Sequence, residues 1–216
     1  MSKVFRRTHD PIWHLQAGML VVIGLQLLTA PTFLLYNKAL LIGLEILLMV
    51  ALIILTPDAY HRVSHSRRMV ALSLIAVVAS VNIVSLLLLV EALLTNSSGL
   101  GGQQLLLNAL TIYVTNIFMF ALWYWEMDGG GPDRRVTGRT RMDFLFTQMA
   151  HPKYAALGWL PGFTDYLYLS ATNVTNFASA DTVPLTHQAK ILMMIQSLAS
   201  VMTIILVAAR AVSVLH

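Results

Sequence analysis

Apolar residues dominate five long stretches of the chain, and short polar or helix-breaking segments such as Thr56-Pro57-Asp58 separate them. The stretches cover residues 12–36, 39–55, 69–94, 104–126 and 189–215. Each is close to the roughly 20 residues that an α-helix needs to cross the hydrocarbon core of a bilayer. The pattern therefore predicts five transmembrane helices.

A further stretch, residues 163–181, is too short and too polar to cross a bilayer as a free helix. It consists of a short amphipathic segment, 163–172, and a compact polar turn, 173–181, and residues 182–186 lead from it into the last long apolar stretch. Irregular backbone at membrane depth survives only where protein or water satisfies its polar groups. A short helix, a polar turn and a spanning helix in this order predict a re-entrant hairpin that lines a cavity.

The overall composition agrees with a membrane protein. The 216 residues are 57% hydrophobic and 11% charged, and the mean hydropathy is +0.71. These values are typical of a polytopic membrane protein rather than a soluble domain, and we expect an all-α fold. The chain has no cysteine, which excludes a disulfide framework and thiolate metal sites.

The second half of the chain carries the residues of a pore motif. They are Phe163-x-Asp165-x-x-Tyr168-x-Ser170, then Thr175, then Asp181-x-x-Pro184-x-Thr186. This stretch resembles the pore module of the potassium-channel superfamily, which has an outer helix, a pore helix, a selectivity filter and an inner helix. The resemblance implies an outer helix at 104–126, a basic linker at 127–162, a pore helix and filter-like turn at 163–181, and an inner helix at 189–215.

On this division, residues 1–103 form three leading transmembrane helices and residues 104–216 form the pore module. The resemblance also implies a homotetramer with one hairpin per subunit around a central axis, and small ions as the passing species. The chain departs from the family at the filter. The family reads Thr-Val-Gly-Tyr-Gly-Asp, whereas this chain reads Asn176-Phe177-Ala178-Ser179-Ala180-Asp181, so both glycines are absent.

The two alanines in the filter-like turn make a potassium-type filter costly. Such a filter dehydrates the ion with stacked backbone carbonyls, and it needs backbone angles that glycine adopts without strain. A residue with a β-carbon costs about 1–2 kcal/mol at each left-handed position. We therefore expect a wider or differently shaped pore without high potassium selectivity. Its pore- and filter-like residues are Asn173, Thr175, Asn176, Phe177, Ala178, Ser179, Ala180 and Asp181.

Asp181, at the mouth of the turn, has two alternative roles. It either anchors the turn before Pro184 by hydrogen bonds, or it adds negative charge that raises the local concentration of cations.

Basic residues are distributed unevenly between the apolar stretches. With a re-entrant hairpin, 12 of the 14 lie on the side of the N-terminus, and Lys38 and Arg210 lie on the other side. The positive-inside rule then places the N-terminus in the cytoplasm and the C-terminus outside. The hairpin enters from the cytoplasmic face, which inverts it relative to potassium channels. We expect an integral protein of a bacterial inner (plasma) membrane, surrounded by membrane lipids.

Charged residues inside apolar spans are rare and usually functional. Glu45 is the deepest of them, and it is a candidate for an ion path or for a protonated or internally paired carboxylic acid. Candidates for hydrogen bonds between helices are Gln26, Asn82, Asn108 and Asn116. Two aromatic segments suit the membrane interface, namely Trp123-Tyr124-Trp125 and Phe144-Leu145-Phe146.

Two other function classes stay open. One is a non-conducting scaffold or lipid-interacting protein that keeps the hairpin as packing. The other is a haem-bearing subunit, because His9-Asp10-Pro11-Ile12-Trp13-His14 weakly resembles the start of b-type cytochrome membrane subunits. A bis-histidine haem needs ligands that face each other between helices, and no histidine falls inside the four later spans. No catalytic or phosphate-binding motif stands out, so we expect no enzyme activity, cofactor, metal or nucleic-acid partner.

Overall fold

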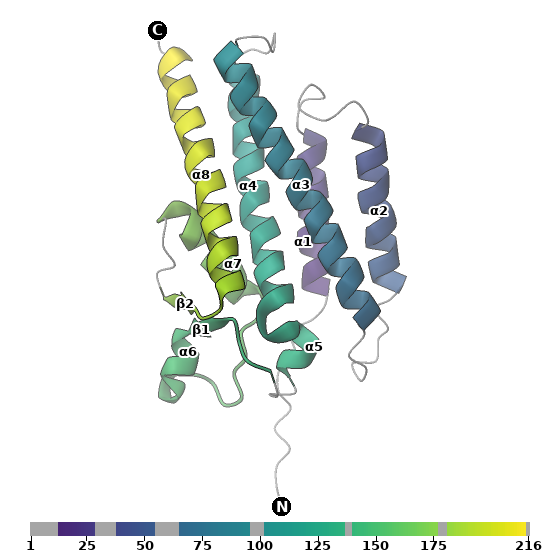
Figure 1. Cartoon of the computed structure of the whole chain (residues 1–216), viewed down its shortest axis with the longest axis vertical. Coiled ribbons are helices and arrows are strands. Elements are labelled where there is room, and N and C mark those ends of the chain that lie inside the picture. The colour runs from purple at the N-terminus through teal and green to yellow at the C-terminus, as the bar shows by residue number, and fades with distance from the viewer. Residues whose placement is uncertain are drawn as a thin grey trace, which may run out of the picture.

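The computed structural model describes residues 13–28, 38–54, 65–95, 102–136, 140–176 and 181–214. Its long helices are α1 (Trp13–Leu28), α2 (Lys38–Ile54), α3 (His65–Thr95), α4 (Gly102–Met127) and α8 (His187–Val214). They run side by side in one bundle (Figure 1). The described chain is therefore mostly helical, as the apolar stretches predicted.

Three of these helices, α3, α4 and α8, are long and apolar enough to cross a membrane. This agrees with an integral membrane protein. The described parts of α1 and α2 have 16 and 17 residues, and the prediction that they also span the membrane stays a prediction.

Helix α4 is the centre of the bundle. It packs against α1, α3, α8 and the shorter helix α7 (Phe163–Thr175), while α2 packs against α3. The bundle buries 56% of the apolar stretch of α4 but only 22% of the apolar stretch of α8. Helix α8 therefore presents a row of apolar side chains away from the bundle. The row consists of Ile191, Met194, Ile195, Leu198, Met202 and Ile205.

A run of three glycines ends α4. One turn of 3-10 helix, η2 (Asp128–Gly130), follows it, and the short helix α5 (Pro132–Arg135) comes next. The φ angles of the three glycines are 58°, 82° and 100°, which glycine adopts without the clash that a β-carbon makes. At Gly131 a β-carbon would also lie 3.3 Å from the Glu126 carbonyl oxygen. The glycines therefore allow the chain to turn tightly at the end of α4.

The basic linker contains a strand that the sequence did not predict. Strand β1 (Phe144–Phe146) pairs antiparallel with β2 (Thr182–Pro184), and Leu145 lies opposite Val183. Helix α6 (Thr147–Ala150) and 3-10 helix η3 (Pro152–Tyr154) follow β1. The described chain is mostly helical, as expected. The small sheet is an addition to the expected all-α fold, and it joins the linker to the segment between α7 and α8.

Aromatic side chains pack between the sheet, α4 and α7. Phe144 and Phe146 of β1 are 0% and 4% exposed, and their ring centroids lie 6.4 and 5.2 Å from that of Tyr166. Tyr124 lies 5.2 Å from Phe144, edge to face, and Trp125 is fully buried. Tyr124, Trp125, Phe144 and Phe146 therefore belong to the protein core rather than to a lipid-facing belt, and their depth relative to the membrane interface stays a prediction.

Candidate functional site

Helix α7 occupies the position of the predicted pore helix. Its 13 residues cover about 20 Å at 1.5 Å per residue, which is shorter than the roughly 30 Å of a hydrocarbon core. The helix rises from the end of the molecule that holds the sheet, and the chain is back at that end in β2, where α8 begins (Figure 1). Helix α7 and strand β2 therefore begin and end this short segment at the same end of the bundle.

A buried polar cluster joins α7 to α4 and α8, with Gln196 of α8 at its centre. Gln196 Nε2 donates to the hydroxyl oxygen of Ser170 at 2.5 Å and to its carbonyl oxygen at 3.3 Å. Gln196 Oε1 accepts from the hydroxyl of Tyr124 at 2.6 Å and from Nδ2 of Asn173 at 2.8 Å. Gln196 is fully buried, and buried polar groups support a fold when they are satisfied in this way.

Further contacts extend this Gln196 cluster along the helices. Asn116 Nδ2 of α4 donates to Ser200 Oγ of α8 at 2.9 Å, which confirms the predicted hydrogen bond between helices. Ser197 Oγ donates to Asn173 Oδ1 at 3.3 Å. Ser170 Oγ donates to the carbonyl of Ile117 at 2.7 Å. One face of α7 is therefore fixed against both α4 and α8.

Asp128 holds the end of α4 to the linker and to α7. Its Oδ1 accepts from the backbone N–H of Asp143 at 2.5 Å and of Phe144 at 3.3 Å. Its Oδ2 accepts from the hydroxyl of Tyr166 at 2.5 Å. Burial raises the pKa of the Tyr166 hydroxyl well above its usual value, so this group remains a hydrogen-bond donor at neutral pH.

Asp143 continues the connection to the start of α8. Its Oδ2 accepts from the backbone N–H of Gly129 at 3.1 Å, and its Oδ1 accepts from the hydroxyl of Thr186 at 2.7 Å. Thr186 Oγ1 accepts from the backbone N–H of Ala189 at 3.3 Å, as a helix N-cap residue does. The start of α8 is therefore tied to the end of α4 through Asp143.

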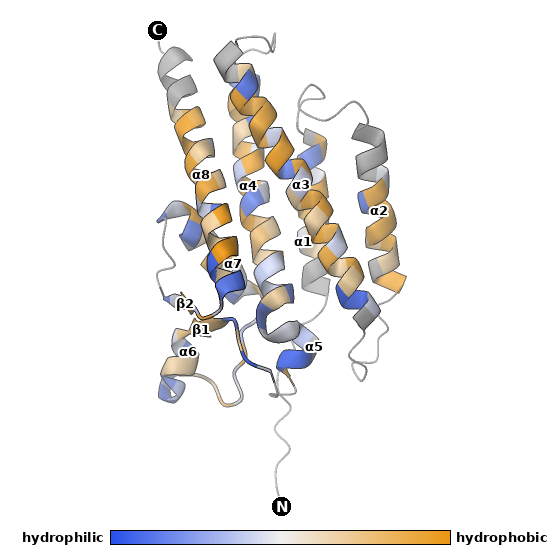
Figure 2. Ribbon diagram, viewed as in Figure 1, coloured by the Kyte–Doolittle hydropathy of each residue, from blue (hydrophilic) through white to orange (hydrophobic). Residues whose placement is uncertain are grey.

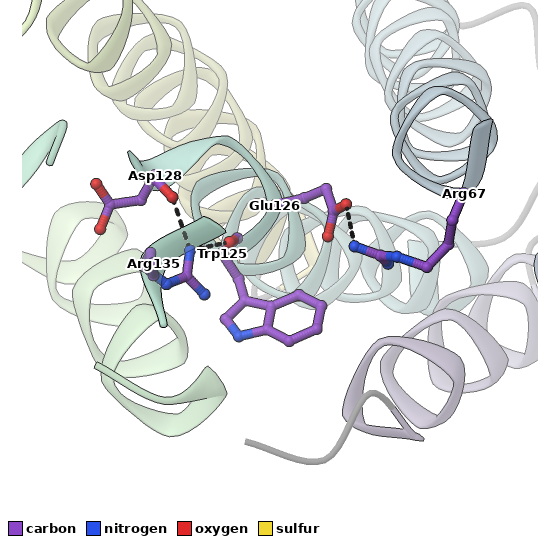
Figure 3. A network of polar contacts seen from close by, with 5 residues as sticks. All are labelled: Arg67, Trp125, Glu126, Asp128 and Arg135. Atoms are coloured by element: carbon purple, nitrogen blue, oxygen red, sulfur yellow. Dashed lines mark hydrogen bonds and ion pairs between the residues drawn. The ribbon is translucent and has the colours of Figure 1, made fainter. Parts of the chain in front are cut away.

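Two arginines complete the charged end of α4 (Figure 3). Arg67 Nη2 of α3 pairs with Glu126 Oε1 at 2.9 Å, and both side chains are buried. Arg135 Nη1 donates to the carbonyl oxygens of Trp125 at 2.5 Å and Asp128 at 2.8 Å. The last carbonyls of a helix carry partial negative charge, so Arg135 caps α4.

The predicted pore residues lie in two environments. Asn173 is 2% exposed and belongs to the Gln196 cluster. Thr175 and Asn176 are exposed at the end of α7, where the Thr175 hydroxyl donates to the carbonyl of Ala171 in its own helix at 2.9 Å. Asp181 is exposed. Phe177, Ala178, Ser179 and Ala180 lie outside the described residues.

Asp181 contacts both α7 and the linker. Its Oδ2 accepts from the hydroxyl of Tyr168 of α7 at 3.4 Å. Its carbonyl oxygen accepts from the hydroxyl of Thr147 at 2.9 Å. These contacts fit the anchoring role, and they leave the exposed carboxylate beside the turn.

Glu45 lies apart from the hairpin, on α2, where it is fully buried. The side-chain amide of Gln26 on α1 faces its carboxylate. The structure therefore brings together two residues that the sequence singled out separately.

The sequence did not reveal the central role of Gln196 or its contacts with Ser170 and Tyr124. A signal for Gln196 was present, because a glutamine in the middle of an apolar span needs a hydrogen-bond partner inside the membrane. No local signal identified its partners, since they depend on the relative rotation of three helices.

Among the described residues, no three His, Asp or Glu side chains gather as metal ligands. His9 and the side chain of His14, which suggested a haem, lie outside the described part. No protein-family model, curated protein or solved structure matches this chain. The functional interpretation therefore depends on the geometry of the chain itself.

Proposed function

We propose that copies of this chain assemble into a membrane pore for the passive passage of small ions, with the hairpin of α7 at its axis. The observation that carries the proposal is the division of polar residues on α7. Ser170 and Asn173 are bonded to α4 and α8, whereas Thr175 and Asn176 are exposed at the tip. Polar groups at membrane depth need protein, water or ions as partners, and a water-filled axis supplies them.

A homotetramer follows from the resemblance to potassium-channel pore modules. In such an assembly the exposed apolar row of α8 would lie between subunits and lipid, which suits its composition. Four Asp181 carboxylates at the mouth would raise the local concentration of cations, because charge in a low-dielectric mouth focuses the field. Cations are therefore the ions that we propose.

High selectivity for potassium over sodium is not part of the proposal, because Ala178 and Ala180 replace the filter glycines. We also propose that the hairpin enters from the cytoplasm. The distribution of basic residues supports this orientation. The elements of the basic linker, α5, β1 and α6, gather at the end of the bundle from which α7 rises (Figure 1).

Ion flux through reconstituted vesicles tests the proposal. Vesicles with potassium on one side and sodium on the other should show flux with weak discrimination between the two ions. Asn176→Leu should strongly reduce flux, because a partly dehydrated ion loses a polar partner. Asn82→Leu on α3 is the control, normalised to folded oligomer, and should keep the wild-type ion preference. Unchanged flux in the Asn176 variant, or a strongly potassium-selective reversal potential, contradicts the proposal.

A non-conducting scaffold is the second candidate, and the contacts of Asn173 favour it. The amide of Asn173 bonds to Gln196, to Ser197 and to the carbonyl of Met193, so a residue predicted to line the pore serves helix packing. If the hairpin only closes the bundle, folded oligomers in vesicles conduct no ion.

A further inference from the structure

The buried pair of Gln26 and Glu45 lies outside the proposed pore. It joins α1 to α2, whereas the hairpin packs against α4 and α8. Glu45 is 0% exposed, although its neighbours Leu44, Ile46 and Leu47 are exposed apolar residues. An ionised carboxylate in apolar surroundings is costly unless it is paired with a charge or loses its own charge by binding a proton.

The described residues place no cation against Glu45. Helices α1 and α3 pack against α2, and their charged or titratable residues lie toward the helix ends. His65, Arg67 and Arg68 are in the first turn of α3, and Glu91 is near its other end. About 13 Å of helix rise separates Glu45 from the end of α2 that meets this first turn, and Arg67 already pairs with Glu126.

Two further titratable residues belong to the same pair of helices. His14 is at the opposite end of α1 from Gln26, and Lys38 begins α2 about two turns before Glu45. The described structure gives neither side chain. Gln26 is therefore the polar group that the structure sets against Glu45.

Gln26 can form a hydrogen bond with either charge state of Glu45. The terminal atom of its amide lies 2.9 Å from Oε2 and 3.0 Å from Oε1 of the carboxyl group. With nitrogen at that position, Gln26 donates to a carboxylate; with oxygen there, it accepts from the O–H of a carboxylic acid. A half-turn of one amide therefore keeps the pair bonded with or without the proton.

We propose that Glu45 is an exchangeable proton-binding site between α1 and α2, with Gln26 as its partner in both states. Binding transfers a proton from hydronium to a carboxylate oxygen and releases water, so no oxidant or reductant takes part. The site changes the charge of the α1–α2 pair without breaking its hydrogen bond. The proposal does not depend on ion passage through the hairpin.

Modification by dicyclohexylcarbodiimide tests the proposal, because this apolar reagent converts a protonated carboxylic acid into an N-acylurea. Glu91, which is exposed, and Glu126, which is paired with Arg67, are internal controls. The full-length protein in lipid nanodiscs is treated over a pH series, and the adduct is located by mass spectrometry. We expect the adduct at Glu45, with a yield that falls as pH rises, and little at the two controls.

Infrared spectroscopy supplies a readout that does not require the reagent to reach the site. The C=O stretching band of a carboxylic acid should fade with rising pH in the wild type, and the part of the band that Glu45 contributes should be missing in Glu45→Gln. Gln26→Leu removes a hydrogen bond from both charge states of Glu45. The bond to the carboxylate is the stronger of the two, so its loss destabilises the charged state more, and the acid band should persist to higher pH.

Three results would overturn the proposal. The first is a wild-type protein without a pH-dependent acid band, and the second is a band that is the same in the wild type and in Glu45→Gln. The third is a pH profile that does not change in Gln26→Leu, because it would show that Gln26 is not the partner of Glu45.

Discussion

Gln196 is the residue at which three helices meet. The hydroxyl of Tyr124, the hydroxyl oxygen of Ser170 and the amide of Asn173 all bond to its side chain. A buried donor or acceptor that loses its partner costs about 1–3 kcal/mol. One side chain therefore fixes both the depth and the rotation of α7 against α8.

Gln196→Leu should lower the free energy of unfolding by about 2 kcal/mol or more, because Tyr124 and Asn173 lose a buried partner. For a chain of this length, that loss corresponds to a fall in melting temperature of about 4–8 °C. Thermal unfolding of the purified protein in detergent measures it. Gln188→Leu changes an exposed glutamine of the same helix and should unfold close to the wild-type temperature. Equal losses in the two variants would contradict the special role of Gln196.

The buried pair of Arg67 and Glu126 leads to a different prediction. Removal of one partner should cost about 3–5 kcal/mol, because the other charge stays buried without it. Arg67→Met and Glu126→Leu should therefore each destabilise the protein strongly, while the double variant should be more stable than either single variant. A double-mutant cycle from thermal unfolding measures the coupling. Simple addition of the two losses would show that the ion pair contributes little.

At the scale of the elements, the β1–β2 sheet joins the linker to the end of the hairpin at which α7 and α8 begin. Strand β2 lies between α7 and α8 in the chain, and β1 follows Asp143, which bonds to Gly129 and Thr186. The hydroxyl of Thr147 adds a bond to the carbonyl of Asp181. The segment between α7 and α8 can therefore move only if the β1–β2 sheet or these side-chain hydrogen bonds break.

The hairpin also predicts which positions water can reach. The chain has no native cysteine, so single cysteines report on single positions. In membrane vesicles, Asn176→Cys should react with a water-soluble maleimide, because the proposed axis hydrates the tip of α7. Two variants serve as controls and should stay unreactive. Asn173→Cys lies in the buried Gln196 cluster. Leu198→Cys replaces a leucine that is 61% exposed on the apolar row of α8. A gel-shift assay measures the yields, and an unreactive Asn176→Cys would argue against a hydrated tip.

At the scale of the whole molecule, polar and apolar residues are distributed along the bundle axis. Hydrophilic residues gather around α5 and the start of α3, and apolar residues cover most of α3 and α8 (Figure 2). Basic residues are retained on the cytoplasmic side of membranes, so we expect this end of the bundle in the cytoplasm.

Labelling from one side of the membrane tests this orientation. Ser2→Cys and Arg134→Cys should be protected from an impermeant thiol reagent in intact cells and should react in inside-out vesicles. Ser97→Cys, in the connection between the third and fourth apolar stretches, should behave in the opposite way and serves as the control. Labelling of the first two positions from outside would restore the orientation of potassium channels.

The positions of the long helices and of the short helix α7 follow from the sequence alone. The predicted limits of 104–126 and 189–215 are close to those of α4 and α8, and the pore helix was expected where α7 lies. The physical reason is local. A long apolar run satisfies its backbone polar groups within itself only as a helix, and Gly129-Gly130-Gly131-Pro132 cannot continue one.

The contacts between polar and aromatic residues, in contrast, depend on how the helices pack. Asn173 and Asn176 are three residues apart, yet one is buried against Gln196 and the other is exposed. Phe144 is buried because β1 pairs with a strand that lies beyond α7 in the chain, and Glu126 meets Arg67 across a separation of 59 residues. Hydropathy fixes which segments are helical, but the rotation and depth of each helix depend on packing against partners far away in the sequence.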